Sequence, residues 1–181
     1  MLEVIDKKHQ ERIQQFQQKG YRLIDLTRNS KDEIYRQFHP SYPHGDVPFP
    51  EFPDYTAQSV EGIWEGLKLF ETTGIDASKF DCMDPNDLSR TQDYYGNYRG
   101  HRFGVNTILT EEEAFEKIYK PLYAWQVFVK MKKEFKTLKE LCQTQPMVWI
   151  VDDVYDDYVL LLMSFVDDIY DEYITQLLSA L

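Results

Sequence analysis

The chain has 181 residues, 43% of them hydrophobic, which is enough to bury the core of one domain of ordinary size. Its formal net charge of −11 argues against duplex nucleic acid as a partner, because a protein that neutralises phosphates needs positive charge. No apolar run reaches the roughly 18 residues of a membrane helix and the first twenty residues do not resemble a signal peptide, so we expect a cytoplasmic protein. Cys82 and Cys142 lie far apart without zinc-type spacing, which predicts neither a disulfide framework nor a structural metal.

The first fifty residues predict a helix, a strand and a long loop, in that order. Residues 3–18 are charged and rich in glutamine and predict a helix that Gly20 ends. Residues 21–26 alternate between apolar and polar side chains, which is typical of a strand. Five prolines between positions 38 and 53 exclude regular structure, and a loop of this length in a compact domain is commonly functional.

A short amphipathic helix is predicted over residues 59–71. Its apolar side chains recur at the helical period and form one stripe that we expect to be buried: Val60, Ile63, Trp64 and Leu67. A second face carries two carboxylates and an ammonium group: Glu61, Glu65 and Lys68. Gly62 and Gly66 each cost about 1 kcal/mol relative to alanine in a helix, which indicates that another backbone or a ligand comes close.

The middle of the chain predicts a turn and two further helices. The Gly-Asn pair at 96–97 lies between tyrosines and predicts a hairpin turn. Residues 110–113 form a capping box that opens a helix whose apolar face includes Phe115, Ile118 and Leu122. Pro121 has no backbone N–H, so we expect two helices, roughly 111–119 and 122–142, that meet at a kink.

The end of the chain predicts a short buried strand over residues 147–151, followed by a closing helix. The helix carries one apolar stripe: Tyr158, Leu162, Phe165, Ile169 and Tyr173. We therefore expect an α+β fold, mainly helical with a small sheet, in a single domain over residues 1–181 whose acidic strand-helix segment spans 147–181.

An acidic motif occurs twice in the last thirty residues. Residues 151–158 and 166–173 each contain the DDxxD spacing with which prenyl-transferring enzymes hold magnesium-bound diphosphate. Fifteen residues along one helix would separate the copies by about 22 Å, which is too far to clamp one diphosphate. We expect a solvated acidic face or a surface for a protein partner or a second copy of the chain, with weak cation binding as the alternative.

A basic cluster lies between positions 90 and 102 and contains Arg90, Arg99, His101 and Arg102. Guanidinium groups fit phosphate oxygens, and nearby tyrosines offer faces on which a base could stack, so the cluster is a candidate anion site. Ion pairs between surface arginines and the many carboxylates are the alternative.

Two histidines flank the proline-rich loop. The spacing of His39, His44 and Asp46 is not a known zinc pattern, so no metal ligation is predicted. Tyr42 and His44 are better candidates for lining the path of a substrate.

Several motifs resemble known families. Residues 39–46 (HPSYPHGD), 59–71 (SVEGIWEGLKLFE) and 100–104 (GHRFG) resemble a group of bacterial and phage proteins without an assigned reaction, over about residues 20–130. The helix over residues 59–70 also resembles the NADAR family, whose members are N-glycosidases that act on ADP-ribose adducts or riboflavin-pathway intermediates. This resemblance implies that Glu61 takes the place of the family's helix glutamate and Lys68 that of its helix lysine.

The first functional hypothesis is therefore a NADAR-like N-glycosidase that acts on a small ADP-ribosyl or ribosyl-phosphate compound without a cofactor. Carboxylates can stabilise an oxocarbenium-like transition state, activate water or protonate the leaving base. The expected catalytic residues are Glu61, Glu65 and Lys68, and the expected substrate-binding residues are Tyr42, His44, Trp64, Arg99, His101 and Arg102. The alternatives are a non-catalytic protein that sequesters a nucleotide-derived signal, and an interaction module whose acidic tail occupies a basic partner.

Overall fold

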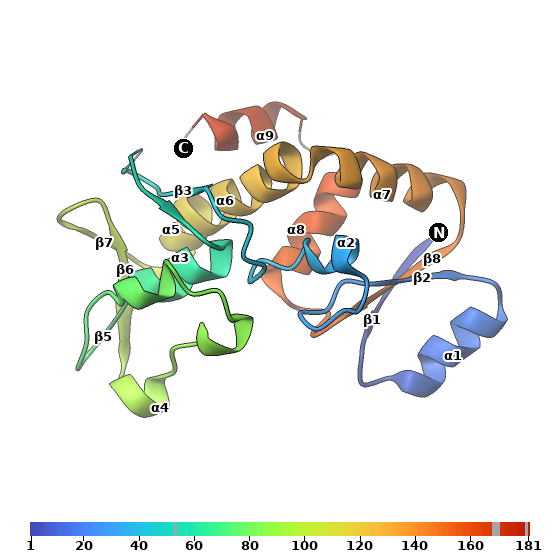
Figure 1. Ribbon diagram of the computed structural model, residues 1–181, viewed down its shortest axis with the longest axis horizontal. Coiled ribbons are helices and arrows are strands. Elements are labelled where there is room, and N and C mark those ends of the chain that lie inside the picture. Colours follow the sequence, from blue (N-terminus) through green and yellow to red (C-terminus); the bar gives the residue numbers. More distant parts are fainter. Residues whose placement is uncertain (53, 168–170, 180) are drawn as a thin grey trace. The chain divides into compact units, whose positions relative to one another are not determined.

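The computed structural model describes residues 1–52, 54–167, 171–179 and 181, and shows the α+β fold that the sequence predicts (Figure 1). The chain forms two compact units. Unit 1 comprises Met1–His39 and Val127–Asp171, and unit 2 comprises Pro40–Gln126 and Glu172–Leu181. The expectation that all 181 residues form one domain stays a prediction.

Unit 1 is built on a parallel three-stranded sheet in the order β1-β8-β2 (Figure 1). Its strands are β1 Leu2–Asp6, β2 Arg22–Asp25 and β8 Met147–Val151. The predicted strands at 21–26 and 147–151 are confirmed. The predicted helix over residues 3–18 is wrong in its first part, because residues 2–6 pair with β8 along its whole length. This long-range pairing outweighs local helix propensity.

The helices of unit 1 include α1 Gln10–Gln18, α2 Glu33–Arg36, α7 Lys132–Thr144 and α8 Asp157–Val166. Ile13 of α1 packs in a small core with Ile5 and Val148 of the sheet. Tyr158, Leu162 and Phe165 of α8 are buried as predicted. The single closing helix is wrong, because α8 ends at Val166 and α9 (Asp171–Leu178) follows separately. Ile169 and the side chain of Tyr173 lie outside the described residues.

Unit 2 contains two antiparallel sheets. The smaller sheet is a hairpin of β3 Val47–Pro48 and β4 Thr56–Ala57. The larger sheet has the order β5-β6-β7, with β5 Lys68–Phe70, β6 Tyr98–Phe103 and β7 Thr107–Leu109. The hairpin turn predicted at 96–97 is wrong, since residues 92–95 form the short helix α4 (Gln92–Tyr95) and the hairpin instead joins β6 to β7.

The helix α3 of unit 2 spans Val60–Leu67 and is shorter than the predicted range 59–71. Ser59 caps it by accepting a hydrogen bond from the Gly62 N–H at 3.0 Å. The predicted stripe is buried except for Trp64, which is half-buried. Lys68 follows as the first residue of β5, so the expected second face of the helix ends at Glu65.

The capping box at Thr110 and Glu113 is confirmed and opens α5 (Glu111–Ala114). Helical structure continues through Pro121, so two helices separated at this residue are not observed. A π-helical turn over Phe115–Tyr119 leads directly into α6 (Lys120–Trp125), which contains Pro121. A second π-helical turn over Gln126–Lys130 precedes α7.

Among the described residues, none of the helices combines the length and the apolar character that crossing a membrane requires.

Candidate functional site

A β-bulge in the larger sheet of unit 2 gathers four side chains on one face. Lys68 of β5 pairs with His101 of β6, but Phe70 pairs with Tyr98, so β6 contains one more residue than β5 between these pairs. Residues three apart on a regular strand lie on opposite faces, whereas an extra residue restores them to the same face. The bulge therefore allows Tyr98 to contact His101.

A cavity of about 220 Å³ opens beside this face. Its lining residues come from β5, from the segment that leads into α4, from β6 and from the first turn of α5: Lys68, Phe70, Arg90, Thr91, Gln92, Tyr98 and Glu111. We call this cavity the Lys68 pocket. It combines an ammonium group, a carboxylate, a phenol and an amide, which is the mixed polar lining of a site for a small polar ligand.

Glu65 holds Lys68 at the edge of this pocket. The Glu65 side chain is buried, with one carboxylate oxygen 2.5 Å from Lys68 Nζ and the other accepting the Arg90 backbone N–H at 2.9 Å. Both oxygens are thus engaged. Glu65 is a positioning residue for Lys68, and the expected carboxylate pair of Glu61 and Glu65 does not face the pocket as one unit.

The His101 side chain contacts the Tyr98 hydroxyl. Its Nδ1 lies 2.5 Å from the Tyr98 hydroxyl, and its ring lies 3.9 Å from the ring of Trp64. Burial and the positive charge of Lys68 lower the pKa of His101 to about 3, so the imidazole is neutral at pH 7. Burial, together with the charge of Glu111, raises the pKa of Tyr98 to about 12, so the phenol keeps its proton. Trp64 and His101 therefore act through Tyr98, as supports for the pocket.

Arg90 lines the Lys68 pocket and also binds backbone carbonyl groups of unit 2, and its expected part in an anion site stays a prediction. Its buried guanidinium donates to the carbonyl oxygens of Glu65 at 3.1 Å, Lys68 at 2.8 Å and Gly74 at 2.9 Å. It also lies 5.1 Å from the ring centres of Phe70 and Tyr95. These bonds satisfy carbonyl groups at the end of α3, and they leave the guanidinium committed to the protein's own backbone.

Arg99 and Arg102, which we expected to bind substrate, make contacts within the protein instead. The Arg99 side chain is 60% exposed and its Nη2 lies 2.7 Å from Glu71 Oε1, as the surface ion-pair alternative predicts. Arg102 Nη1 donates to the Val105 carbonyl at 3.2 Å, in the turn between β6 and β7. Neither arginine belongs to the lining of the Lys68 pocket. The bulge explains the outcome, because Arg99 is the extra residue of β6.

The remaining predicted site residues lie elsewhere in unit 2. Glu61 is half-buried in the first turn of α3, and its backbone N–H donates to Pro40 at 3.0 Å. The rings of Tyr42 and His44 lie 4.8 Å apart in the loop before β3. None of these three side chains belongs to the lining of the Lys68 pocket.

Sequence reasoning missed Glu111, Thr91 and Gln92. Glu111 follows Thr110 in the capping box, where an acidic residue is explained by the helix terminus alone. Glu112 and Glu113 are also acidic residues in the first turn of the same helix. Only the tertiary structure therefore shows that Glu111 is the one that lines the pocket.

One protein family has a sequence pattern that matches residues 6–157, which is most of the chain. The chain belongs to DUF6939, a family of unknown function. The search of curated proteins finds no match. The DUF6939 match includes all seven residues that line the Lys68 pocket.

The DUF6939 match also includes a buried histidine in unit 1. His39 Nε2 lies 3.6 Å from Asp152, at the end of β8, and Asp152 accepts the Arg28 backbone N–H at 2.8 Å and pairs with Lys7. Burial lowers the pKa of His39 to about 3, with the charge of Arg28 as the next cause. The first copy of the acidic repeat therefore begins at a strand end and not along one helix, and Asp152 is engaged within unit 1. Residues 168–170 of the second copy lie outside the described residues.

Within the described ranges, no three side chains of histidine, cysteine, aspartate or glutamate are arranged to hold a metal ion.

Proposed function

We propose that the protein is an N-glycosidase that releases the base from a ribosyl-phosphate or ADP-ribosyl small molecule bound in the Lys68 pocket. The observation that carries the proposal is the meeting of Lys68, Tyr98 and Glu111 around one cavity of about 220 Å³. A site of this size accepts a sugar with its attached phosphate more readily than a macromolecule.

Each of the three side chains has a distinct part in this reaction. The Lys68 ammonium, fixed by Glu65, attracts a phosphate oxygen of the substrate. The Tyr98 phenol, fixed by His101, contacts a ribose hydroxyl. The Glu111 carboxylate stabilises the positive charge that develops on the sugar and accepts a proton from the attacking water.

The reaction needs only water besides the substrate. The oxygen of water forms a bond to the anomeric carbon, and the bond from that carbon to the base nitrogen breaks with its electron pair going to the base. A positively charged pyridinium base leaves neutral, so it needs no proton from the protein. One carboxylate is then sufficient, which agrees with the single carboxylate in the lining of the Lys68 pocket.

The second candidate is a protein that binds a nucleotide-derived compound without turning it over. The observation in its favour is that Glu65, which we expected to be catalytic, is fully engaged with Lys68 and the Arg90 backbone. A pocket that only binds needs Lys68 and Tyr98 but no carboxylate.

Nicotinamide mononucleotide tests the proposal, because its base leaves as a neutral pyridine. We expect the wild-type protein to release nicotinamide, measured by chromatography, and Lys68→Met to lower kcat/KM by about a hundredfold through loss of a charge-assisted phosphate contact. Lys117→Met is the matched control, since Lys117 is exposed and outside the pocket lining.

Nucleotide recovered intact, but bound in a manner that Lys68→Met weakens, would favour the binding protein over the enzyme. Equal activity of Lys68→Met and Lys117→Met would contradict both candidates at this pocket.

A further inference from the structure

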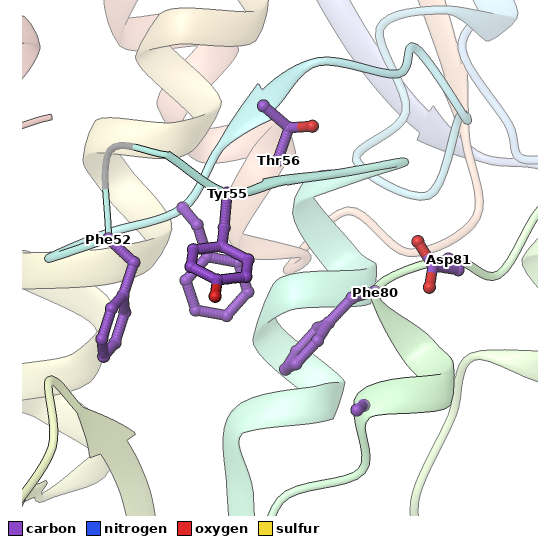
Figure 2. A pocket seen from close by; sticks show the side chains of 7 residues that line it. Phe52, Tyr55, Thr56, Phe80 and Asp81 are labelled. Atoms are coloured by element: carbon purple, nitrogen blue, oxygen red, sulfur yellow. The ribbon is translucent and has the colours of Figure 1, made fainter.

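Unit 2 contains a second and larger cavity, with a volume of about 450 Å³, that the proposed reaction does not use. It is lined mostly by aromatic side chains: Phe49, Phe52, Tyr55, Thr56, Ala77, Phe80 and Asp81. Figure 2 shows Phe52 and Tyr55 on the loop between β3 and β4, with Phe80 opposite them. We call this cavity the aromatic pocket.

The rings of the aromatic pocket stand nearly perpendicular to one another. Phe49 and Phe80 have ring centres 4.8 Å apart and an interplanar angle of 84°, and Phe52 and Tyr55 are 6.3 Å apart at 88°. Phe49 and Phe52 are 6.0 Å apart at 64°. Ring centres at these distances belong to rings in edge-to-face contact, so the side chains form one packed aromatic wall of the pocket.

Backbone hydrogen bonds join the three residues of the β3–β4 loop that carry these rings. Phe49 and Tyr55 are joined by a hydrogen bond from the Phe49 N–H to the Tyr55 carbonyl at 3.1 Å. The Phe52 N–H donates to Phe49 at 3.1 Å, and the Tyr55 N–H donates to Phe52 at 3.0 Å. Glu51 adopts a left-handed conformation with φ of 63°, which completes the tight turn.

Gly66 fixes the opposite wall. A Cβ atom at this position would overlap the Phe80 ring, so the glycine of α3 allows Phe80 to lie directly against the helix. The Gln58 N–H also donates to the Phe80 carbonyl at 2.8 Å, which ties the segment of Phe80 to the end of β4.

The charge at the aromatic pocket favours a cation. Asp81 is exposed at the lining, and within the part of the chain that the structure describes it makes no ion pair or hydrogen bond. None of the described residues that line the pocket is lysine or arginine, and the whole chain has a net charge of −11. The faces of aromatic rings are themselves electron-rich and attract a positive group.

We propose that the aromatic pocket binds a small organic cation with a methylated ammonium group, such as the headgroup of choline. The methyl groups would lie against the aromatic wall, and Asp81 supplies negative charge at the lining of the same pocket. The volume of about 450 Å³ exceeds a bare headgroup and leaves room for the rest of a small molecule.

The test compares choline with 3,3-dimethyl-1-butanol, which has the same shape but replaces the charged nitrogen by carbon. Binding to the full chain is followed by protein NMR. We expect choline to bind at least about threefold more tightly than the neutral alcohol, since the charge contributes the cation–π attraction. The shifted amide signals should belong to the non-proline residues of 49–52, 54–56 and 77–81.

Substitutions at Tyr55 and Asp81, which are both exposed, test the aromatic and the charge contribution to choline binding separately. Tyr55→Leu keeps an apolar side chain but removes the aromatic face, and should weaken choline binding by about three- to tenfold. Tyr55→Phe keeps the ring and should bind choline as the wild type does. Asp81→Asn should weaken binding by about two- to fivefold.

Equal affinity for choline and the neutral alcohol would overturn the proposal, because the pocket would then be merely apolar. An absence of saturable choline binding, or shifts confined to residues outside the pocket, would overturn it as well. None of these results bears on the Lys68 pocket, whose test uses a different ligand and different variants.

Discussion

Arg90 and Lys68 are both cationic residues of unit 2, but they differ in burial and in what they contact. Arg90 is buried and gives its hydrogen bonds to three carbonyl groups of the protein. The Lys68 ammonium lies 2.5 Å from Glu65, at the edge of a cavity. Sequence alone made Arg90 a candidate for anion binding, since an arginine near glycines and tyrosines suits either role.

We predict that Arg90→Lys lowers the free energy of unfolding by about 3 kcal/mol. A lysine ammonium cannot reproduce the planar set of donors that reaches three separate carbonyls, so buried acceptors would lose their partners. Urea unfolding followed by circular dichroism measures the change. Arg99→Lys is the control and should cost less than about 0.5 kcal/mol, because Arg99 forms an exposed ion pair. Equal losses in the two variants would contradict the structural role of Arg90.

Two buried histidines predict a loss of stability in acid. The pKa values of His39 and His101 are lowered to about 3 in the folded state, while the ordinary value is 6.5. Between these values the unfolded state binds more protons, so the free energy of unfolding falls as the pH drops from 6.5 toward 3. Each histidine should contribute a slope of up to about 1.4 kcal/mol per pH unit.

Urea unfolding at several pH values between 7 and 4 measures this slope. His39→Gln and His101→Gln should each reduce it, because glutamine does not titrate. A slope that is unchanged in both variants would show that carboxylates alone cause the acid sensitivity.

At the scale of elements, α3 is organised by what lies close to its backbone. A Cβ atom on Gly62 would lie 2.6 Å from the Lys79 carbonyl oxygen, and one on Gly66 would overlap the Phe80 ring. The sequence prediction that these glycines mark a close approach is therefore confirmed, and the approaching group is the segment 79–80 of the same unit.

We predict that Gly62→Ala and Gly66→Ala each destabilise the protein by about 1–3 kcal/mol, although alanine is the better helix former by about 1 kcal/mol. Gly74→Ala is the matched control, because nothing lies within 4 Å of its Cβ position. Thermal unfolding should show a lower Tm for the first two variants and little change for the third. Stabilisation by Gly66→Ala would contradict the contact with Phe80.

Local signals in the sequence predicted the elements whose stability is local. The capping box at Thr110 depends on neighbouring residues and is confirmed. The strand at 147–151 was found from its short apolar run and is also confirmed, although its partners β1 and β2 lie far away along the chain. The strand β1 was missed, because residues 3–6 were included in the charged, glutamine-rich helix predicted over 3–18, whereas they pair with β8. Sequence periodicity does not report such pairing.

At the scale of the whole molecule, the candidate site was only partly predictable. Lys68 and Glu65 were found from helical spacing, although Lys68 lies in β5 and Glu65 acts as its support. The positions of Tyr98, His101 and Arg99 depend on the bulge in β6, which the sequence did not predict. The bulge brings Tyr98 into contact with His101, and Arg99 forms a surface ion pair. The sequence alone does not distinguish Glu111 from the neighbouring glutamates of α5.

We propose that Glu111 is the essential carboxylate of a catalytic site in the Lys68 pocket. Release of nicotinamide from nicotinamide mononucleotide by Glu111→Gln and by Glu112→Gln tests it most directly, because both residues lie in the first turn of α5 and only Glu111 lines the pocket. We predict that Glu111→Gln lowers kcat by about a hundredfold or more while Glu112→Gln retains wild-type turnover. Wild-type turnover by a folded Glu111→Gln protein would contradict the account.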